Sequence, residues 1–162
     1  MAKQRVFGKM KITFSFEFKT TDKIWMYDTV TKSWTQGPSL NEKRKWHSCL
    51  VDQKTSTIHV MGGRGEHGNR LSSTETLKYV NKRWEISSAS NLPGPLTHSA
   101  ATASRTNDIV GYLVGGDGNE IRSDIWALRR SDMKWVEGQK RLQIPRTRHT
   151  LVNVRLSDIP GC

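Results

Sequence analysis

The chain has 162 residues with 26 Lys or Arg and 15 Asp or Glu, which gives a formal net charge of +11. Six tryptophans and a hydrophobic content of 35% exclude a fully disordered chain. No apolar run approaches the roughly 20 residues that a transmembrane helix needs, and no signal-peptide core follows the N-terminus. The two cysteines, Cys49 and Cys162, have no metal or disulfide spacing, so we expect a cytoplasmic protein without a membrane partner.

Short strand-like segments follow one another along the whole chain. They are rich in β-branched and aromatic residues or alternate between polar and apolar positions, and polar turns separate them. Apolar periodicity of helical length is absent, so we expect an all-β fold with four strands in each repeated unit. In chain order, the clearest expected strands are 24–27, 47–51, 56–61, 76–79, 97–101, 109–114, 124–128 and 148–154.

Three markers recur among these strands in a constant order. The spacing is 51 residues for a histidine, 50 and 51 for a tryptophan, and 53 for a double glycine. Because three residue types keep one period, the chain contains an internal repeat. The markers are His47, His98 and His149; Trp34, Trp84 and Trp135; and the pairs Gly62–Gly63 and Gly115–Gly116.

A unit of about 50 residues and four strands resembles the kelch repeat, which forms one blade of a β-propeller. The resemblance covers about residues 24–154 and implies structural roles for its markers. Glycines let the backbone turn where blades crowd together, and each tryptophan packs against a neighbouring blade. The matching residues are Gly62, Gly63, Gly115, Gly116, Tyr27, Tyr79, Trp34, Trp84 and Trp135, with Leu128 in place of a third tyrosine.

The units add up to a partial kelch β-propeller of about three blade-equivalents, each a four-stranded antiparallel sheet. In the first unit, either residues 6–9 or residues 11–18 provide the second strand. Propellers usually have 4–8 blades, so we expect either a fragment of a larger propeller, which the chain end favours, or self-association that completes a ring. The units are a partial, degenerate first blade (1–34), two whole repeats (35–84 and 85–135), the opening strand of a further repeat (136–154) and a tail (155–162).

The loop that leads from one unit into the next carries the candidate partner-binding residues. Arg44 and Arg146 occupy one matching position, and Trp46 and Arg148 another, whereas the middle unit lacks them. In BTB–kelch ubiquitin-ligase adaptors, which this chain resembles, such arginines face acidic peptides, and a guanidinium holds a carboxylate with two hydrogen bonds. The resemblance therefore implies a protein–protein interaction module, the substrate-recruiting part of such an adaptor. The alternative is that these are solvated loop arginines.

Other functions find less support in the sequence. Residues 63–68 match G-x-G-x-x-G, but no helix follows, so we expect no dinucleotide cofactor. The repeated histidines fall on different units, so we expect no metal site. Galactose oxidase, a kelch-propeller enzyme with copper and a Tyr–Cys crosslink, gives one alternative, yet neither cysteine has a supporting spacing and no catalytic residues stand out. Nucleic-acid binding is a further alternative, which the scattered basic residues do not favour.

Overall fold

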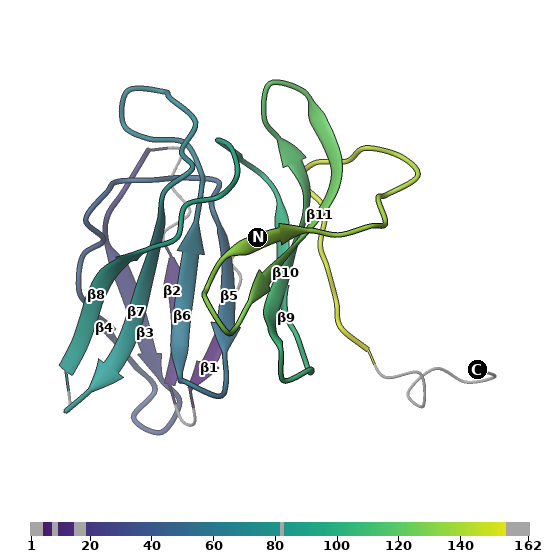
Figure 1. Cartoon of the computed structure of the whole chain (residues 1–162). Coiled ribbons are helices and arrows are strands. Elements are labelled where there is room, and N and C mark those ends of the chain that lie inside the picture. Colours follow the sequence, from purple (N-terminus) through teal and green to yellow (C-terminus); the bar gives the residue numbers. More distant parts are fainter. Residues whose placement is uncertain (1–4, 8–9, 15–18, 82, 155–162) are drawn as a thin grey trace.

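The computed structural model describes residues 5–7, 10–14, 19–81 and 83–154, which form strands and connecting loops but no helix. The strands form three four-stranded sheets, and in Figure 1 the first lies behind the second, with the third to the right. The first sheet contains β1 (Arg5–Phe7), β2 (Met10–Phe14), β3 (Ile24–Asp28) and β4 (Ser33–Gln36). The second contains β5 (Ser48–Asp52), β6 (Thr57–Met61), β7 (Thr74–Val80) and β8 (Arg83–Ala89). The third contains β9 (Ala100–Ala103), β10 (Ile109–Asp117), β11 (Ile121–Arg129) and β12 (Trp135–Glu137).

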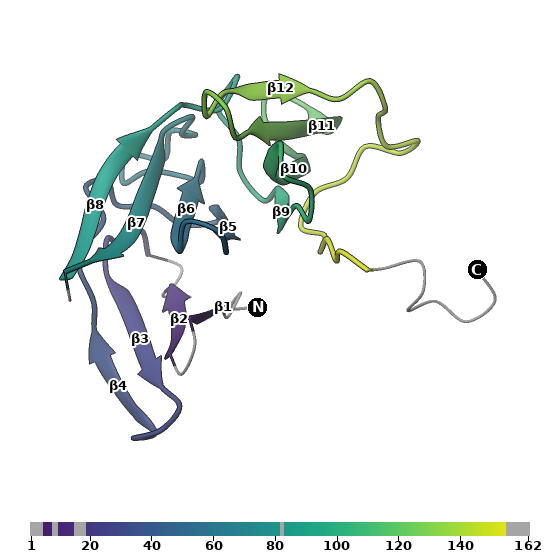
Figure 2. The same ribbon diagram turned by 60° about the horizontal axis from the view of Figure 1, so that its bottom comes forward.

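Each sheet is an antiparallel meander in which neighbours in the chain are neighbours in the sheet. The three sheets fan out in an arc, with first strands β1, β5 and β9 on the inside and fourth strands outside (Figure 2). Because β5 and β9 also contact each other, the second and third sheets meet along their inner strands. This arrangement is that of propeller blades around an axis. The predicted fold class, an all-β partial kelch propeller of three blades, is confirmed.

The unit boundaries expected from the sequence differ from the sheets at several points. Residues 34, 84 and 135 lie inside fourth strands, because the marker tryptophan occupies the fourth strand rather than ending a unit. The first blade has all four strands, with β2 as its second, so it is complete rather than partial in its backbone. The expected tail, 155–162, and Cys162 lie outside the described residues.

Residues 148–154 were expected to open a further repeat, but they form no strand. A first strand pairs with the second strand of its own unit, and the described residues contain no such partner for this segment. It is held instead by the third blade: the Asn153 side-chain amide donates to the Ala103 carbonyl at 3.0 Å, and Arg105 donates to the Asn153 carbonyl at 3.3 Å.

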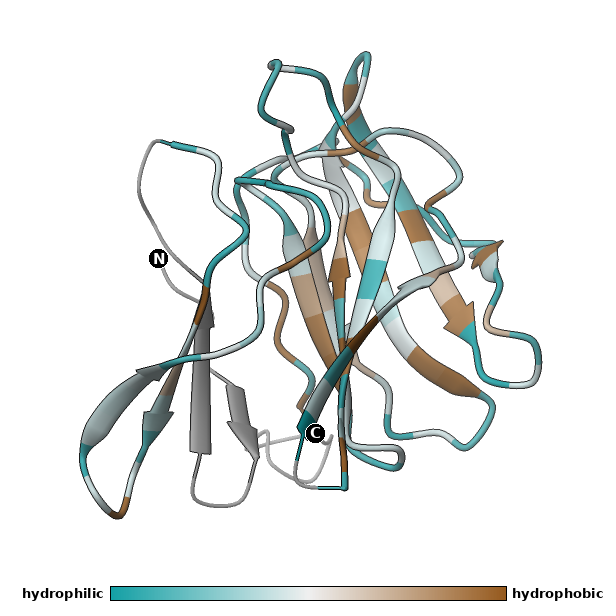
Figure 3. Cartoon of the chain, turned by 90° about the vertical axis from the view of Figure 1, so that its left-hand side faces the viewer, coloured by the Kyte–Doolittle hydropathy of each residue, from teal (hydrophilic) through white to brown (hydrophobic). Residues whose placement is uncertain are grey.

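Two apolar cores lie between successive blades, and the tryptophan markers of the second and third blades each pack against the core shared with the preceding blade. Trp84 packs against the first core and Trp135 against the second. Trp34, in the first blade, is 51% exposed and contacts the Tyr27 ring at 5.0 Å. Figure 3 shows apolar segments along the strands, with mostly polar loops at their ends. The first core comprises Ile24, Leu40, Cys49, Val51, Ile58, Val60 and Leu77; the second comprises Leu50, Met61, Leu92, Leu96, Ala101, Val110, Leu113 and Leu128.

The double glycines lie at the ends of β6 and β10, where a loop from the following unit crosses close to the backbone. Gly62 and Gly115 have φ values of 60° and 56°, in the left-handed region that favours glycine. A Cβ on Gly115 would lie 2.5 Å from the Arg146 carbonyl oxygen. Gly63 and Gly116 also have positive φ.

No helix in the described part of the chain is long and apolar enough to cross a membrane.

Candidate partner-binding site

Three residues, one from the segment that follows each blade, form a continuous row at one end of the blades. Trp46, His98 and Arg148 all have left-handed backbones, with φ values of 56°, 54° and 57°. The His98 amide donates to the Trp46 carbonyl, and the Arg148 amide to the His98 carbonyl, each at 3.0 Å. These shared features make the three positions structurally equivalent. We call them the Trp46–His98–Arg148 row.

The row brings together an exposed aromatic ring and an imidazole. The Trp46 indole, 37% exposed, stacks on the His98 ring with 4.6 Å between centroids and 29° between planes. The Lys45 ammonium lies 4.6 Å from the indole centroid and the Arg64 guanidinium 5.9 Å from it. Cations at such distances are attracted to the indole face. The ring is therefore held in place on the surface and surrounded by positive charge.

Burial and the neighbouring cations both affect the pKa of His98. Burial lowers the pKa of His98 below 6.5, and the positive charges of Arg148, Arg64 and Arg70 lower it further, while Asp117 acts in the opposite direction. Arg70 pairs with Asp117 at 3.0 Å, which neutralises that carboxylate. The row therefore has a surplus of positive charge, which suits an anionic ligand.

A cleft of about 560 Å³ lies beside the row, between residues 19–20, which precede β3, and the β6–β7 loop. It is lined by the same Lys45 and Arg64 that flank the indole. The acid in its wall, Glu66, pairs with Lys43 at 2.8 Å, so the basic residues dominate its charge. The full lining is Lys19, Thr20, Lys45, Arg64, Gly65, Glu66 and Gly68.

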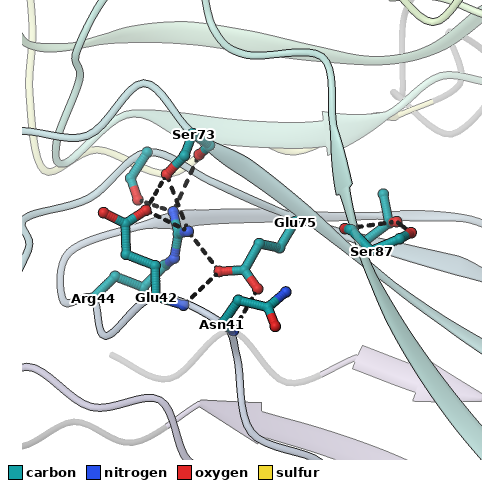
Figure 4. Close-up of polar contacts among 8 residues, drawn as sticks. Asn41, Glu42, Arg44, Ser73, Glu75 and Ser87 are labelled. Atoms are coloured by element: carbon teal, nitrogen blue, oxygen red, sulfur yellow. Dashed lines mark hydrogen bonds and ion pairs between the residues drawn. The ribbon is translucent and has the colours of Figure 1, made fainter.

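Arg44 does not reach this surface, although the sequence placed it among the partner-binding candidates. Its side chain is fully buried and pairs with the buried carboxylate of Glu75 at 2.7 Å. The guanidinium also donates to the carbonyls of Gly62 and Ser73, and Figure 4 shows this network. Arg44 is therefore neither a ligand contact nor the solvated arginine of the alternative hypothesis.

Arg146 matches Arg44 in its backbone but not in its side chain. The amides of Arg44 and Arg146 donate to equivalent carbonyls, at 3.0 and 3.1 Å, and Leu96 does the same in the middle unit. Arg146 is nevertheless exposed. The buried carboxylate of the third blade, Asp124, pairs with Arg122 and Arg141 instead. Of the four candidates, Trp46 and Arg148 lie in the row, Arg146 is exposed two residues before Arg148, and Arg44 is internal.

Sequence reasoning missed His98, Lys45 and Arg64. The constant spacing of 51 residues aligned His98 with His47 and His149, whereas the structure aligns it with Trp46 and Arg148. The residue after each double glycine could have indicated the correct alignment. Arg64 forms a backbone β-bridge with Lys45, directly before Trp46, and Asp117 forms one with Thr97, directly before His98.

The other motifs from the sequence assemble no site in the described residues. No group of three or more His, Cys, Asp or Glu side chains there is arranged to hold a metal ion. The G-x-G-x-x-G segment forms a tight turn in which the Gly65 amide donates to the Asn69 carbonyl and the Gly68 amide to the Gly65 carbonyl. With these amides engaged and no helix following, the segment lacks the features of a dinucleotide site.

Comparison with known proteins agrees with the geometry, although no protein-family model matches the chain. The chain is similar to alpha-scruin of Limulus polyphemus, with 29% identity over 99 residues, or 61% of this chain and 10% of that protein. Two F-box/kelch-repeat proteins of Arabidopsis thaliana are 33% and 27% identical to it over 72 and 97 residues. These matches cover 44% and 56% of this chain but 16% and 20% of the plant proteins. The chain thus spans a fifth or less of these relatives, and its repeats are of the kelch type, arranged as three blades of a partial β-propeller.

Proposed function

We propose that this chain is a protein–protein interaction module that binds an acidic segment of its partner at the Trp46–His98–Arg148 row. The observation that carries the proposal is the exposed indole of Trp46, stacked on His98 at 4.6 Å and flanked by Lys45 and Arg64. Large aromatic rings and arginines are the residues that contribute most to binding at protein interfaces. A surplus of cations around such a ring selects a partner rich in Asp or Glu.

The wider role follows from the relatives and is part of the same proposal. Two of them are F-box/kelch-repeat proteins by name, and none of the three names denotes an enzyme. Together with the resemblance to BTB–kelch adaptors, these names support a non-catalytic, substrate-recruiting part of a ubiquitin-ligase adaptor, acting in the cytoplasm. The exposure of Trp34, whose counterparts Trp84 and Trp135 pack against a preceding blade, supports self-association through the open face of the first blade.

The binding proposal is tested by titrating the protein with a fluorescently labelled peptide rich in Glu and Asp. We expect the Arg146→Glu, Arg148→Glu double variant, and separately Trp46→Ala, to weaken binding at least about tenfold, because charge-assisted contacts contribute about 1.5–3 kcal/mol. A matched control reverses two charges elsewhere on the surface, in Lys78→Glu, Arg83→Glu, where both residues are exposed. Binding that survives in the folded Arg146/Arg148 variant and in Trp46→Ala refutes the proposal.

The same titration separates a peptide from a nucleic acid as the ligand. Single-stranded DNA added as competitor should displace the peptide weakly at 150 mM salt, because interaction with phosphates falls steeply as salt rises. Displacement by DNA at concentrations below those of unlabelled peptide would assign the row to nucleic acid instead.

A further inference from the structure

The loop that presents Trp46 is tied to the second blade by the buried guanidinium of Arg44. Its Nη1 donates to the Gly62 carbonyl at 2.8 Å and to the Ser73 carbonyl at 3.1 Å. Its Nη2 donates to Glu75 Oε1 at 2.7 Å and to Ser73 Oγ at 3.2 Å. Nη2 also donates to Glu42 Oε2 at 3.3 Å. Five hydrogen bonds to four residues therefore hold this side chain in place, and Figure 4 shows how they converge.

The carboxylate that binds Arg44 also binds the beginning of the same loop. Glu75 Oε2 accepts a hydrogen bond from the Asn41 amide at 2.7 Å, and Oε1 accepts one from the Glu42 amide at 3.2 Å. Glu75 is itself buried in β7. One rigid carboxylate therefore holds residues 41–44 at both ends. Removing Arg44 leaves the buried Glu75 without its counter-charge, whereas removing Glu75 leaves Arg44 with Glu42 alone, at 3.3 Å.

The backbone that carries Trp46 continues directly from this anchor. The Arg44 backbone forms a β-bridge with Thr21, and the Lys45 backbone forms one with Arg64. The chain therefore reaches Trp46 with backbone hydrogen bonds on both sides. Trp46 then adopts a φ of 56°, and a left-handed backbone at a large residue persists only where its surroundings impose it. That conformation directs the indole onto His98.

We propose that Arg44 is a positioning residue for the binding site: through its buried pair with Glu75 it fixes the loop in the one conformation in which Trp46 stacks on His98. Arg44 touches no ligand in this role. Its significance for partner binding rests on the proposed function, whereas its effect on the Trp46–His98 stack does not. Arg146, the backbone equivalent of Arg44, is exposed and has no such role.

The test reads the stack directly, without a ligand. The His98 ring stacks on the Trp46 ring, so the NMR resonance of its Hε1 proton is expected upfield of that of an unstacked histidine. The resonance is assigned by its loss in His98→Gln. In Arg44→Met it should move most of the way to its position in Trp46→Ala. In Arg44→Lys, which keeps the charge but not the branched donor group, it should move part of the way.

Two further variants separate positioning from general stability. Arg44→Leu, Glu75→Leu replaces the buried pair by apolar side chains, a change that often preserves folding, and should still displace the His98 resonance. Leu77→Ala removes a fully buried side chain from β7 of the same blade without removing a hydrogen bond of Arg44 or Glu75, and should destabilise the protein without moving that resonance. Affinity for the acidic peptide should fall at least about tenfold in the Arg44 variants and stay within about twofold in Leu77→Ala.

The outcomes distinguish this inference from the proposed function. An unchanged His98 resonance in the folded Arg44→Leu, Glu75→Leu protein overturns the positioning role. A displaced resonance with unchanged peptide affinity supports the positioning role and refutes the row as the binding site, and Trp46→Ala would then bind normally as well.

Discussion

Acidification should weaken this fold through one buried histidine. His59 lies in the middle of β6 with an exposed fraction of 1%, and neither ring nitrogen has a hydrogen-bond partner among the described residues. Burial lowers the pKa of His59 from 6.5 to about 4; the charge of Asp52 opposes this effect, and that of Arg130 adds to it. The folded protein therefore keeps His59 neutral where the unfolded chain is already protonated.

The sign and size of the effect follow from linkage. Above pH 6.5 both states are neutral and His59 has no influence on pH dependence. As the pH falls from 6.5 to about 4, the unfolded state gains a proton that the folded state cannot take up, so stability is lost. One unit of pKa difference between the two states corresponds to ~1.4 kcal/mol, so the loss in free energy of unfolding approaches about 3 kcal/mol. This is a large part of the 5–15 kcal/mol that is typical of a domain.

Urea denaturation at pH 7, 6, 5 and 4.5 measures this loss. His59→Leu should flatten the pH dependence between pH 6.5 and 4.5, while the same change at the exposed His67 should leave it as in the unchanged protein. The ion pair of Asp52 with Arg130 does not contribute to the pH dependence in this range. The pKa of Asp52 is lowered below 3.8, so the stability that it contributes is lost only at pH values below this window. An equal loss of stability in His59→Leu and the unchanged protein would refute the reasoning.

Three other predictions follow from single contacts. Gly115→Val should lower the free energy of unfolding by at least about 1–3 kcal/mol, since φ is 56° and the new Cβ meets the Arg146 carbonyl oxygen at 2.5 Å; thermal denaturation measures it. Arg130→Met should cost about 2–4 kcal/mol in urea denaturation, because it leaves the buried Asp52 without the two hydrogen bonds, at 2.6 and 3.1 Å, that join the second and third blades. Affinity for an acidic peptide, measured by calorimetry, should rise as the pH falls below 6.5, because a bound carboxylate raises the lowered pKa of His98 and so favours its protonation.

Each of these predictions has a matched control. Gly94→Ala should be nearly neutral, since its Cβ would come no closer than 3.7 Å to a neighbouring atom. Arg129→Met, which breaks an exposed pair with Asp132, should lower the stability much less than Arg130→Met does, because solvent screens an exposed ion pair. An equal loss in the two variants would argue against the interblade pair. In His98→Gln the acid-dependent gain in affinity should disappear, and its persistence would assign the proton to another group.

The order of strands and the type of fold could be predicted because they depend on local features of the chain. Alternation of side chains identified most strands within a few residues, and a spacing near 50 identified the blade. The segment 148–154 is the exception. Its composition resembles a strand, but a strand exists only where a neighbour accepts its hydrogen bonds, and composition does not report that neighbour.

The candidate site was predicted in part. The loop that carries Trp46, and its match with Arg148, followed from comparing the repeats. The inclusion of His98 did not, because the constant spacing of the histidines concealed that the backbone of the middle unit is offset by one residue.

The sequence by itself therefore determined the repeat, the all-β blades and the loops in which recognition was expected, since period and alternation are properties of nearby residues. Only the tertiary structure decided that Arg44 is buried while Arg146 is exposed. The reason is the carboxylate of Glu75, which lies 31 residues further along the chain and meets Arg44 only in the folded blade. Burial of a charge depends on such distant partners, and it separated an internal anchor from a surface contact at two positions that look alike in the sequence.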